Sequence, residues 1–396
     1  MKKMKIIKKQ EGFSILEMMI TMSLFLIVLG SVYVMVVHYG DVSRTEHARL
    51  HMQQDSRFMM THFTQELKDA GAVLTIASSG EFLGGREPYF NGIFPLNHDD
   101  YPDGVIVAAG DPEAVTKLTD DYVREDDGNF LTVETTTLPG YIPGEEWDVQ
   151  PWKAKQKGII IGPDGYFVFE VKDVPGETTI EMRELPVYYS GLLNAKTGTS
   201  ASAKVYVDKD PDAVTEVVTG DSVTYPKNAP VIRLTSFGIY IFREVKHPQY
   251  AESERMVRQL IRISDTKGDA DPLQDYSQAV YSVISENIYD MQIAYRTFQN
   301  FGEVTPDTTM DPTDQFYAGT GTSTDYNTLL TRIRQRQLKQ LDIELVSTTD
   351  EYGGRGESSH KIPPIGDRYS YEMPPGKYNV KVLSLVIEPR NYNIFF

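Results

Sequence analysis

An uninterrupted apolar stretch near the N-terminus most constrains what this chain can fold into. Residues 18–37 carry no charged side chain. Five residues interrupt the stretch only mildly: Thr21, Ser23, Gly30, Ser31 and Tyr33. As an α-helix it would be about 30 Å long, which matches the hydrocarbon core of a bilayer. The sequence therefore predicts a membrane-spanning helix.

Charge is distributed unevenly along the chain. The first twelve residues hold five lysines against one acidic residue, Glu11, whereas the whole chain has a formal net charge of −17. Lysine-rich flanks stay in the cytoplasm, so everything beyond residue 38 is expected outside it. An acidic surface cannot neutralise phosphates, so no nucleic-acid partner is expected. The chain has no cysteine, which excludes disulfides and thiolate metal sites.

Glu17 lies one residue before the apolar stretch and needs an explanation. A carboxylate at membrane depth costs about 2.5–3.5 kcal/mol by comparison with similar groups, and such residues are functional candidates. Cleavage between Gly12 and Phe13 would create an α-amino group four residues away, and the amine of a neighbouring subunit could then neutralise Glu17. The alternative is a Glu17 side chain that simply reaches the membrane surface.

Two other kinds of N-terminal segment compete with this interpretation. A secretory signal has an apolar core of roughly 7–15 residues and a small-residue cleavage site. Here the apolar stretch is longer, and the sequence His38-Tyr39-Gly40 follows it. A plain signal anchor remains open, but it leaves Glu17 unexplained.

The lysine-rich leader, Gly12, Phe13, Glu17 and the long apolar helix together resemble the prepilin signature of type IV pilins and type II secretion pseudopilins. The resemblance implies cleavage after Gly12 by a prepilin peptidase, N-methylation of Phe13 and a role for Glu17 in ordering assembly. It also implies four kinds of partner: other pilins and minor pilins bound through the N-terminal helix, the peptidase, an inner-membrane assembly platform, and membrane lipid before assembly.

The helix is expected to continue beyond the membrane, because no proline occurs before Pro88. Six apolar residues recur at near-helical spacing: Met52, Phe58, Met59, Phe63, Leu67 and Ala70. They predict an amphipathic segment that Gly71 ends. The predicted segments are a leader (1–12), a transmembrane and filament-core helix (13–38), its amphipathic continuation (39–72) and a β-rich globular head (73–396).

The head is rich in turns and in tyrosine, which favours strands. Strands are predicted at residues 105–109, 131–136, 158–171 as a hairpin, 231–245, 257–264, 291–297, 342–348 and 378–387. Short helices are predicted at 280–289 and 326–335, and polar surface insertions at 78–103, 138–157, 192–228 and 300–325. The fold class is α+β: a long N-terminal hydrophobic α-helix packed against an antiparallel β-sheet head with large loop insertions.

The later segments resemble those of PilW-like minor pilins. The run from Ser285 to Tyr295 is similar to that group's short helix feeding a strand. Residues 338–347 are similar to the next strand, and residues 378–391 to a closing strand that ends in Arg390-Asn391. The type II secretion pseudopilin of the J type has a similar layout and stays open as a relative.

Two acidic loops are weak calcium candidates. Asp208, Asp210 and Asp212 begin like a calcium loop, but Ala213 stands where glycine is expected and Thr219 where a bidentate Glu belongs. A second acidic loop holds Asp265, Asp269, Asp271 and Asp275. An ordinary acidic loop is the simpler interpretation of both, and no other cofactor is expected.

The sequence predicts a minor pilin, not an enzyme: an inner-membrane precursor with its head outside the cytoplasm, later part of an extracellular pilus. One alternative is a minor pseudopilin in a periplasmic pseudopilus. An alternative of another class is a membrane-anchored adhesin or ligand-binding protein. No arrangement of residues in the sequence indicates a catalytic site.

Overall fold

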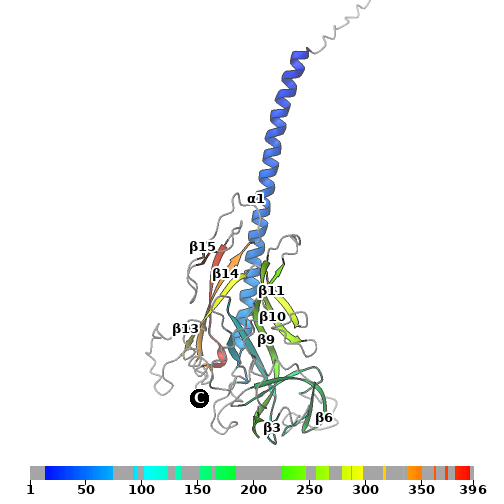
Figure 1. Ribbon diagram of the computed structural model, residues 1–396, viewed down its shortest axis with the longest axis vertical. Coiled ribbons are helices and arrows are strands. Elements are labelled where there is room, and N and C mark those ends of the chain that lie inside the picture. Colours follow the sequence, from blue (N-terminus) through cyan, green and yellow to red (C-terminus); the bar gives the residue numbers. More distant parts are fainter. Residues whose placement is uncertain are drawn as a thin grey trace, which may run out of the picture.

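A computed structural model describes residues 14–74, 92–96, 102–123, 130–134, 152–162, 166–183, 224–246, 256–266, 279–286, 288–297, 315–317, 333, 338–349, 361–362, 371–372 and 380–392. In these residues one long helix leads into a head of antiparallel sheets, the predicted α+β class. Figure 1 shows the first half of the helix extending clear of the strands, and β3 and β6 at the opposite end of the head.

Helix α1 (Ile15–Asp69) has 55 residues and is therefore about 82 Å long. The Ser14 hydroxyl accepts from the Leu16 amide at 3.3 Å and caps the first turn. Gly71 follows the helix with a φ of 75°, the conformation that glycine adopts most easily, as predicted for the helix end. Its amide donates to the Ala108 carbonyl at 2.9 Å, which fastens this end to the head.

The larger sheet contains nine described strands. They are β1 (Ile93–Leu96), β2 (Gly104–Lys117), β4 (Phe130–Thr132), β5 (Lys157–Ile161), β6 (Tyr166–Gly176), β7 (Thr179–Arg183), β9 (Pro230–Lys246), β10 (Met256–Thr266) and β11 (Ala279–Ser285). β9 is the central strand of this sheet and pairs with three others. One of its edges pairs with β2, and the other pairs with β5 near its start and with β10 near its end. The sheet therefore divides into a part beside α1 and a part remote from it.

The second sheet has the order β13 (Gln315–Tyr317), β12 (Ile288–Thr297), β14 (Leu338–Thr348) and β17 (Val380–Ile387). Asp103 joins the two sheets. Its amide donates to the Met291 carbonyl at 2.8 Å, and its carboxylate accepts from the Ile293 amide at 2.9 Å. Two short pairs, β3 (Tyr122–Val123) with β8 (Thr224–Tyr225) and β15 (Lys361–Ile362) with β16 (Tyr371–Glu372), and the 3₁₀ helix η3 (Arg390–Tyr392) complete the described elements.

Two apolar cores follow from this arrangement. The second half of α1 and both sheets bury one core, which includes Phe63, Tyr240 and Ile293. The opposite face of the larger sheet buries the other core, which includes Trp152 and Ile239. Ile239 and Tyr240 face opposite ways because side chains alternate along a strand. The head is thus built on both faces of one sheet.

Three predictions need correction or remain outside the described residues. The predicted helix at 280–289 is wrong: residues 280–285 belong to β11, which pairs with β10, and residues 288–289 begin β12. The predicted strand at 131–136 ends at Thr132, the last residue of β4. Of the predicted helix at 326–335, the structure describes Ile333 alone, and most of the predicted surface insertions also fall outside the described residues.

Candidate functional site

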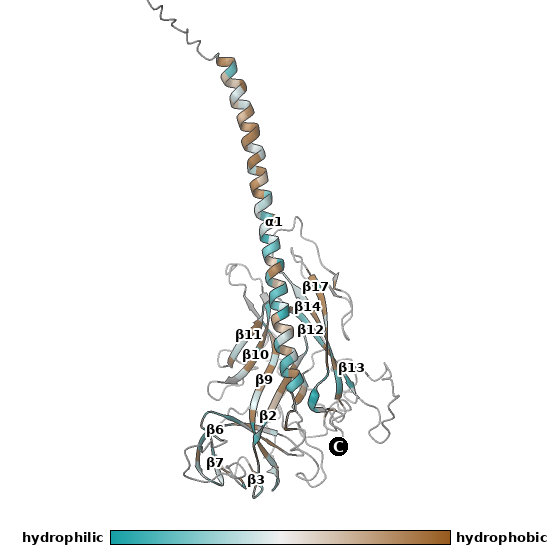
Figure 2. Ribbon diagram, turned by 180° about the vertical axis from the view of Figure 1, so that it is seen from behind, coloured by the Kyte–Doolittle hydropathy of each residue, from teal (hydrophilic) through white to brown (hydrophobic). Residues whose placement is uncertain are grey.

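The first half of α1 is an apolar surface that none of the described strands covers. No residue from Ile15 to Leu50 is buried, although most side chains before residue 38 are apolar. Exposed fractions of the large apolar side chains run from 45% at Val37 to 81% at Ile15. Figure 2 shows this hydrophobic length projecting from the head. A contiguous apolar surface of this size marks a membrane or protein contact.

The three hydroxyl residues of the apolar stretch other than Tyr33 are satisfied within the helix. The hydroxyls of Thr21, Ser23 and Ser31 each donate to the carbonyl four residues earlier, Ser23 at 2.9 Å and Ser31 at 2.8 Å. A bonded hydroxyl costs far less in an apolar environment than an unbonded one. α1 is the described helix that is long and apolar enough to cross a membrane.

Glu17 lies in the exposed first turn of α1. A carboxylate there interacts favourably with the positive end of the helix dipole. Gly12 and Phe13 lie outside the described residues, so cleavage between them, methylation of Phe13 and the pairing of Glu17 with an amine stay predictions. Ser14, the first described residue, is the N-cap of α1.

The second half of α1 is fixed to the head by a stripe of buried side chains. Its members are Met52, Ser56, Met59, Phe63, Leu67 and Ala70, spaced three or four residues apart. Phe63 is fully buried and meets the Tyr240 ring edge-on at 4.8 Å between centroids. Phe58 was predicted on this stripe, but it is 58% exposed, because it lies about 100° around the helix from Met59.

Ser56 takes the place in the stripe that Phe58 was expected to fill. Its hydroxyl donates to the Met52 carbonyl at 2.6 Å and lies 3.0 Å from the buried Ser347 hydroxyl. Since the Ser56 hydrogen is used within the helix, Ser347 is the donor of the second bond. A polar residue is therefore accommodated in the interface because β14 provides it with a partner.

A polar cluster fastens α1 to the larger sheet beside the stripe. Arg262 on β10 donates to both carboxylate oxygens of Glu66, at 3.0 and 3.2 Å. The Tyr240 hydroxyl donates to Glu66 at 2.5 Å, so His62 Nδ1, 3.2 Å away, donates to Tyr240. Gly238 leaves room for the Arg262 side chain that pairs with Glu66, because a Cβ at position 238 would lie 2.7 Å from Arg262 Nε.

The cluster shifts the titration of two of its members. Burial, helped by the neighbouring Glu66 carboxylate, raises the pKa of Tyr240 well above its usual value. Burial alone would lower the pKa of Arg262, but Glu66 and Tyr240 outweigh it and raise that pKa. Tyr240 therefore stays neutral and Arg262 charged across the physiological pH range. The contacts of both side chains with Glu66, called the Glu66 latch below, persist over that range.

The predicted closing segment does not end as a strand. β17 stops at Ile387, and Arg390-Asn391 lie in η3, beside the end of α1. The Asn391 amide donates to the carbonyls of Asp69 and Ala70 at 3.2 and 3.1 Å. The Asp69 carbonyl also accepts from the Ala72 amide at 3.1 Å, so the cap that Asn391 adds matters most for the Ala70 carbonyl. Arg390 adds a long, exposed contact to Asp69 at 3.9 Å.

The described residues contain no group of three or more potential metal ligands. Asp208, Asp210, Asp212, Asp269, Asp271 and Asp275 lie outside them, and Asp265 is described only as part of β10. Calcium therefore stays a hypothesis. The contacts that sequence reasoning missed, such as Glu66 with Arg262, join residues too distant along the chain for any local pattern to reveal.

Comparison with known families identifies the N-terminus. Residues 7–33 match the prokaryotic N-terminal methylation motif, a span that contains Gly12, Phe13 and Glu17. No curated protein and no solved structure matches the chain. The motif and the apolar helix behind it indicate a membrane-anchored precursor that is processed by prepilin peptidase and assembles with other pilins. The N-terminus of this chain therefore carries the methylation motif that is typical of type IV prepilin-like proteins.

Proposed function

We propose that this chain is a minor pilin of a type IV pilus. Prepilin peptidase cuts it between Gly12 and Phe13, Phe13 is N-methylated, and α1 carries the mature subunit into the filament or its tip complex. Before assembly the chain rests in the inner membrane with its head outside the cytoplasm. Its partners are the peptidase, the assembly platform and other pilins.

One observation carries the proposal: the contrast between the two halves of α1. Residues 15–50 leave their apolar side chains uncovered, whereas the stripe from Met52 to Ala70 is buried in the head. The first half can therefore move from lipid to the helices of other subunits without disturbing the fold, and burial in either environment stabilises it. The methylation motif at the start of the same helix supports this transfer.

The size of the head supports a minor role. Strands lie on both sides of α1, and the larger sheet extends well beyond its C-terminal end (Figure 1). Such heads are harder to tile densely around a shared bundle of helices than small ones. A pseudopilin of a type II secretion system would use the same helix, and the filament with which the chain co-purifies separates the two.

Intact-mass and N-terminal analysis tests the processing step on membrane-extracted protein, with and without co-expressed peptidase. The mature chain is expected to begin at Phe13 and to carry one added methyl group. A chain that still begins at Met1 in the presence of active peptidase overturns the proposal and favours a signal-anchored binding protein.

The role of Glu17 is tested by measuring how much of each variant chain is found in sheared filaments. Glu17→Gln is expected to be cut normally yet to enter filaments poorly, because its charge no longer meets the Phe13 amine of a neighbour. Glu177→Gln is the matched control: the same change at an exposed turn residue of the head, away from α1. Equal incorporation of the two variants would remove Glu17 from the assembly step.

A further inference from the structure

A groove lies where α1 meets β17. Met52, Met60 and Leu383 form its apolar floor, and Arg57 and Lys381 stand at its rim, around a hollow of about 390 Å³. The floor is buried or half-buried, and both rim side chains are exposed. β17 is the last strand of its sheet, so the groove runs between an edge strand and a helix.

The two rim cations have no carboxylate partner in the part of the chain that the structure describes. Among the described residues neither Arg57 nor Lys381 forms an ion pair, whereas Arg233, Arg262 and Arg296 each pair with an acidic side chain. In a chain with a net charge of −17, two unpaired cations beside an apolar floor form a local positive site. A complementary surface must supply apolar side chains and a carboxylate.

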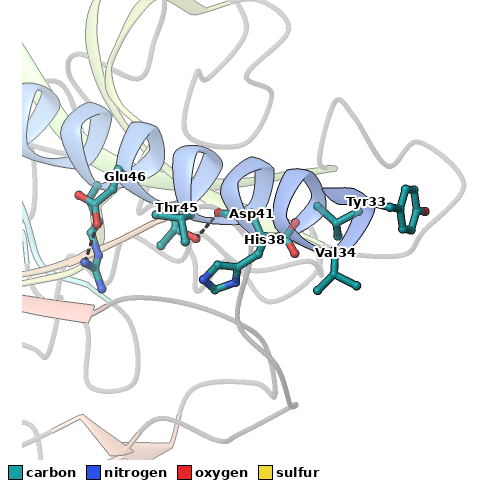
Figure 3. A pocket seen from close by; sticks show the side chains of 9 residues that line it. Tyr33, Val34, His38, Asp41, Thr45 and Glu46 are labelled. Carbon is teal, nitrogen blue, oxygen red and sulfur yellow. Dashed lines mark hydrogen bonds and ion pairs between the residues drawn. The ribbon is translucent and has the colours of Figure 1, made fainter. Parts of the chain in front are cut away.

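The exposed part of α1 offers such a surface. A stripe of side chains between Tyr33 and Arg49 borders a hollow of about 720 Å³ along the helix. It contains the apolar residues Val34, Val37 and Val42 and two acidic residues, Asp41 and Glu46, of which Glu46 pairs with Arg49. The Asp41 carboxylate has no ion-pair partner among the described residues. Figure 3 shows Val34, His38 and Thr45 pointing to one side of the helix, with Asp41 among them.

We propose that the groove of one copy of this chain receives the stripe of a second copy. Asp41 of the second copy lies between Arg57 and Lys381 of the first, and its valines pack on the methionine floor. This inference rests on the proposed function, because both helices must leave the membrane in parallel.

The contact also fixes how far one copy is displaced from the next. Asp41 and Arg57 are sixteen residues apart, so the second copy is shifted by about 24 Å along the helix axis, away from the membrane. Groove and stripe are different surfaces, so each contact leaves one groove and one stripe free. Such a head-to-tail contact can therefore join two copies within a filament without closing a ring.

Disulfide trapping tests the contact directly, because the natural chain has no cysteine. Full-length Asp41→Cys and Arg57→Cys chains with different tags are expressed together with the peptidase and assembly partners, and filaments are then oxidised. A mixed dimer is expected only when both variants are present. Glu177→Cys, at an exposed turn residue remote from the groove, replaces Arg57→Cys as the control.

Charge exchange tests the same contact without cysteine. Asp41→Lys is expected to lower the chain's share in filaments by roughly fivefold, the size expected for losing an exposed ion pair. Combining Asp41→Lys with Arg57→Glu and Lys381→Glu is expected to restore it, since all copies then carry the exchanged pair. All three residues are exposed and unpaired, so the fold is not disturbed.

The outcomes separate this contact from the proposed function. Cysteine variants that enter filaments but give no more mixed dimer than the Glu177→Cys control overturn the contact and leave the proposed function standing. An Asp41→Lys defect that the reversed rim does not relieve also overturns it. Wild-type chains that never enter filaments refute the proposed function itself.

Discussion

The buried stripe on α1 predicts a large difference between two identical substitutions on one helix. Phe63 is fully buried against Tyr240, whereas Phe58, five residues earlier, is 58% exposed. Burying a phenylalanine contributes about 1.5–3 kcal/mol, and the cavity left by truncation raises the cost of Phe63→Ala to about 3–5 kcal/mol. Phe58→Ala removes little buried surface and should change the free energy of unfolding by less than about 0.5 kcal/mol.

Urea titration followed by pulse proteolysis measures this difference on the full chain in detergent. The urea midpoint of Phe63→Ala is expected to fall well below that of the wild type, while that of Phe58→Ala stays close to it. Helix propensity changes equally in the two variants, so it cancels from the comparison. Equal losses at both positions would mean that α1 presents a different face to the head, and the argument for its buried stripe would fail.

Three further predictions concern polar contacts. Arg262→Met should lower the free energy of unfolding by about 1.5–3 kcal/mol in the same titration, because it leaves the half-buried Glu66 without its charged partner, and adding Glu66→Leu should recover part of that loss. Asn391→Ala should speed hydrogen exchange in the last turn of α1 by roughly tenfold, because the Ala70 carbonyl loses its donor and the Asp69 carbonyl loses one of two. Burial alone would raise the pKa of Asp111, but the Arg233 hydrogen bond, the Glu113 amide and the Arg233 charge together outweigh burial and lower that pKa. The folded pKa of Asp111 lies below the unfolded value of about 4, so the stability that its ionised carboxylate contributes is fully present above about pH 4 and is lost as the pH falls through the folded pKa. The difference in unfolding free energy between the wild type and Asp111→Asn should therefore become smaller in acid.

The helix and its two halves were predictable from the sequence because their signals are local. Continuous apolar character predicts a membrane span, and a spacing of three and four residues predicts a buried stripe. The predicted stripe was wrong at one position, Phe58, because apolar character alone does not show which face of the helix a sheet will cover. Ser56 occupies the buried position instead, since β14 offers the Ser347 hydroxyl to it.

The head was predictable strand by strand but not as an arrangement. The long strands β2, β9, β10, β12, β14 and β17 all cover segments predicted as strands. Residues 280–289 were predicted helical, whereas residues 280–285 are extended, because a short apolar run fits either structure and pairing with β10 decides between them. Pairing depends on residues that are far apart along the chain, and no local pattern reports it.

The contacts that fasten α1 to the head were the least predictable part of the candidate site. Glu66 meets Arg262 across 196 residues, and Asn391 reaches Ala70 across 321. Arg390-Asn391 was noted in the sequence as the end of a strand. The role of Asn391 as a helix cap depends on the folded structure, which brings the end of the chain beside the end of α1.

These fastenings act together because they are distributed along the axis of the helix. The stripe from Met52 to Ala70 covers about 27 Å of α1, with the Glu66 latch and the Asn391 cap near its far end. A subunit held in an assembly by its exposed helix is pulled along this axis. Moving α1 by one turn, about 5.4 Å, would displace every side chain of the stripe from its site and break both polar contacts at once. A force along the helix axis therefore acts on all the contacts between α1 and the head at the same time, while the exposed half of α1 stays free to exchange lipid for protein.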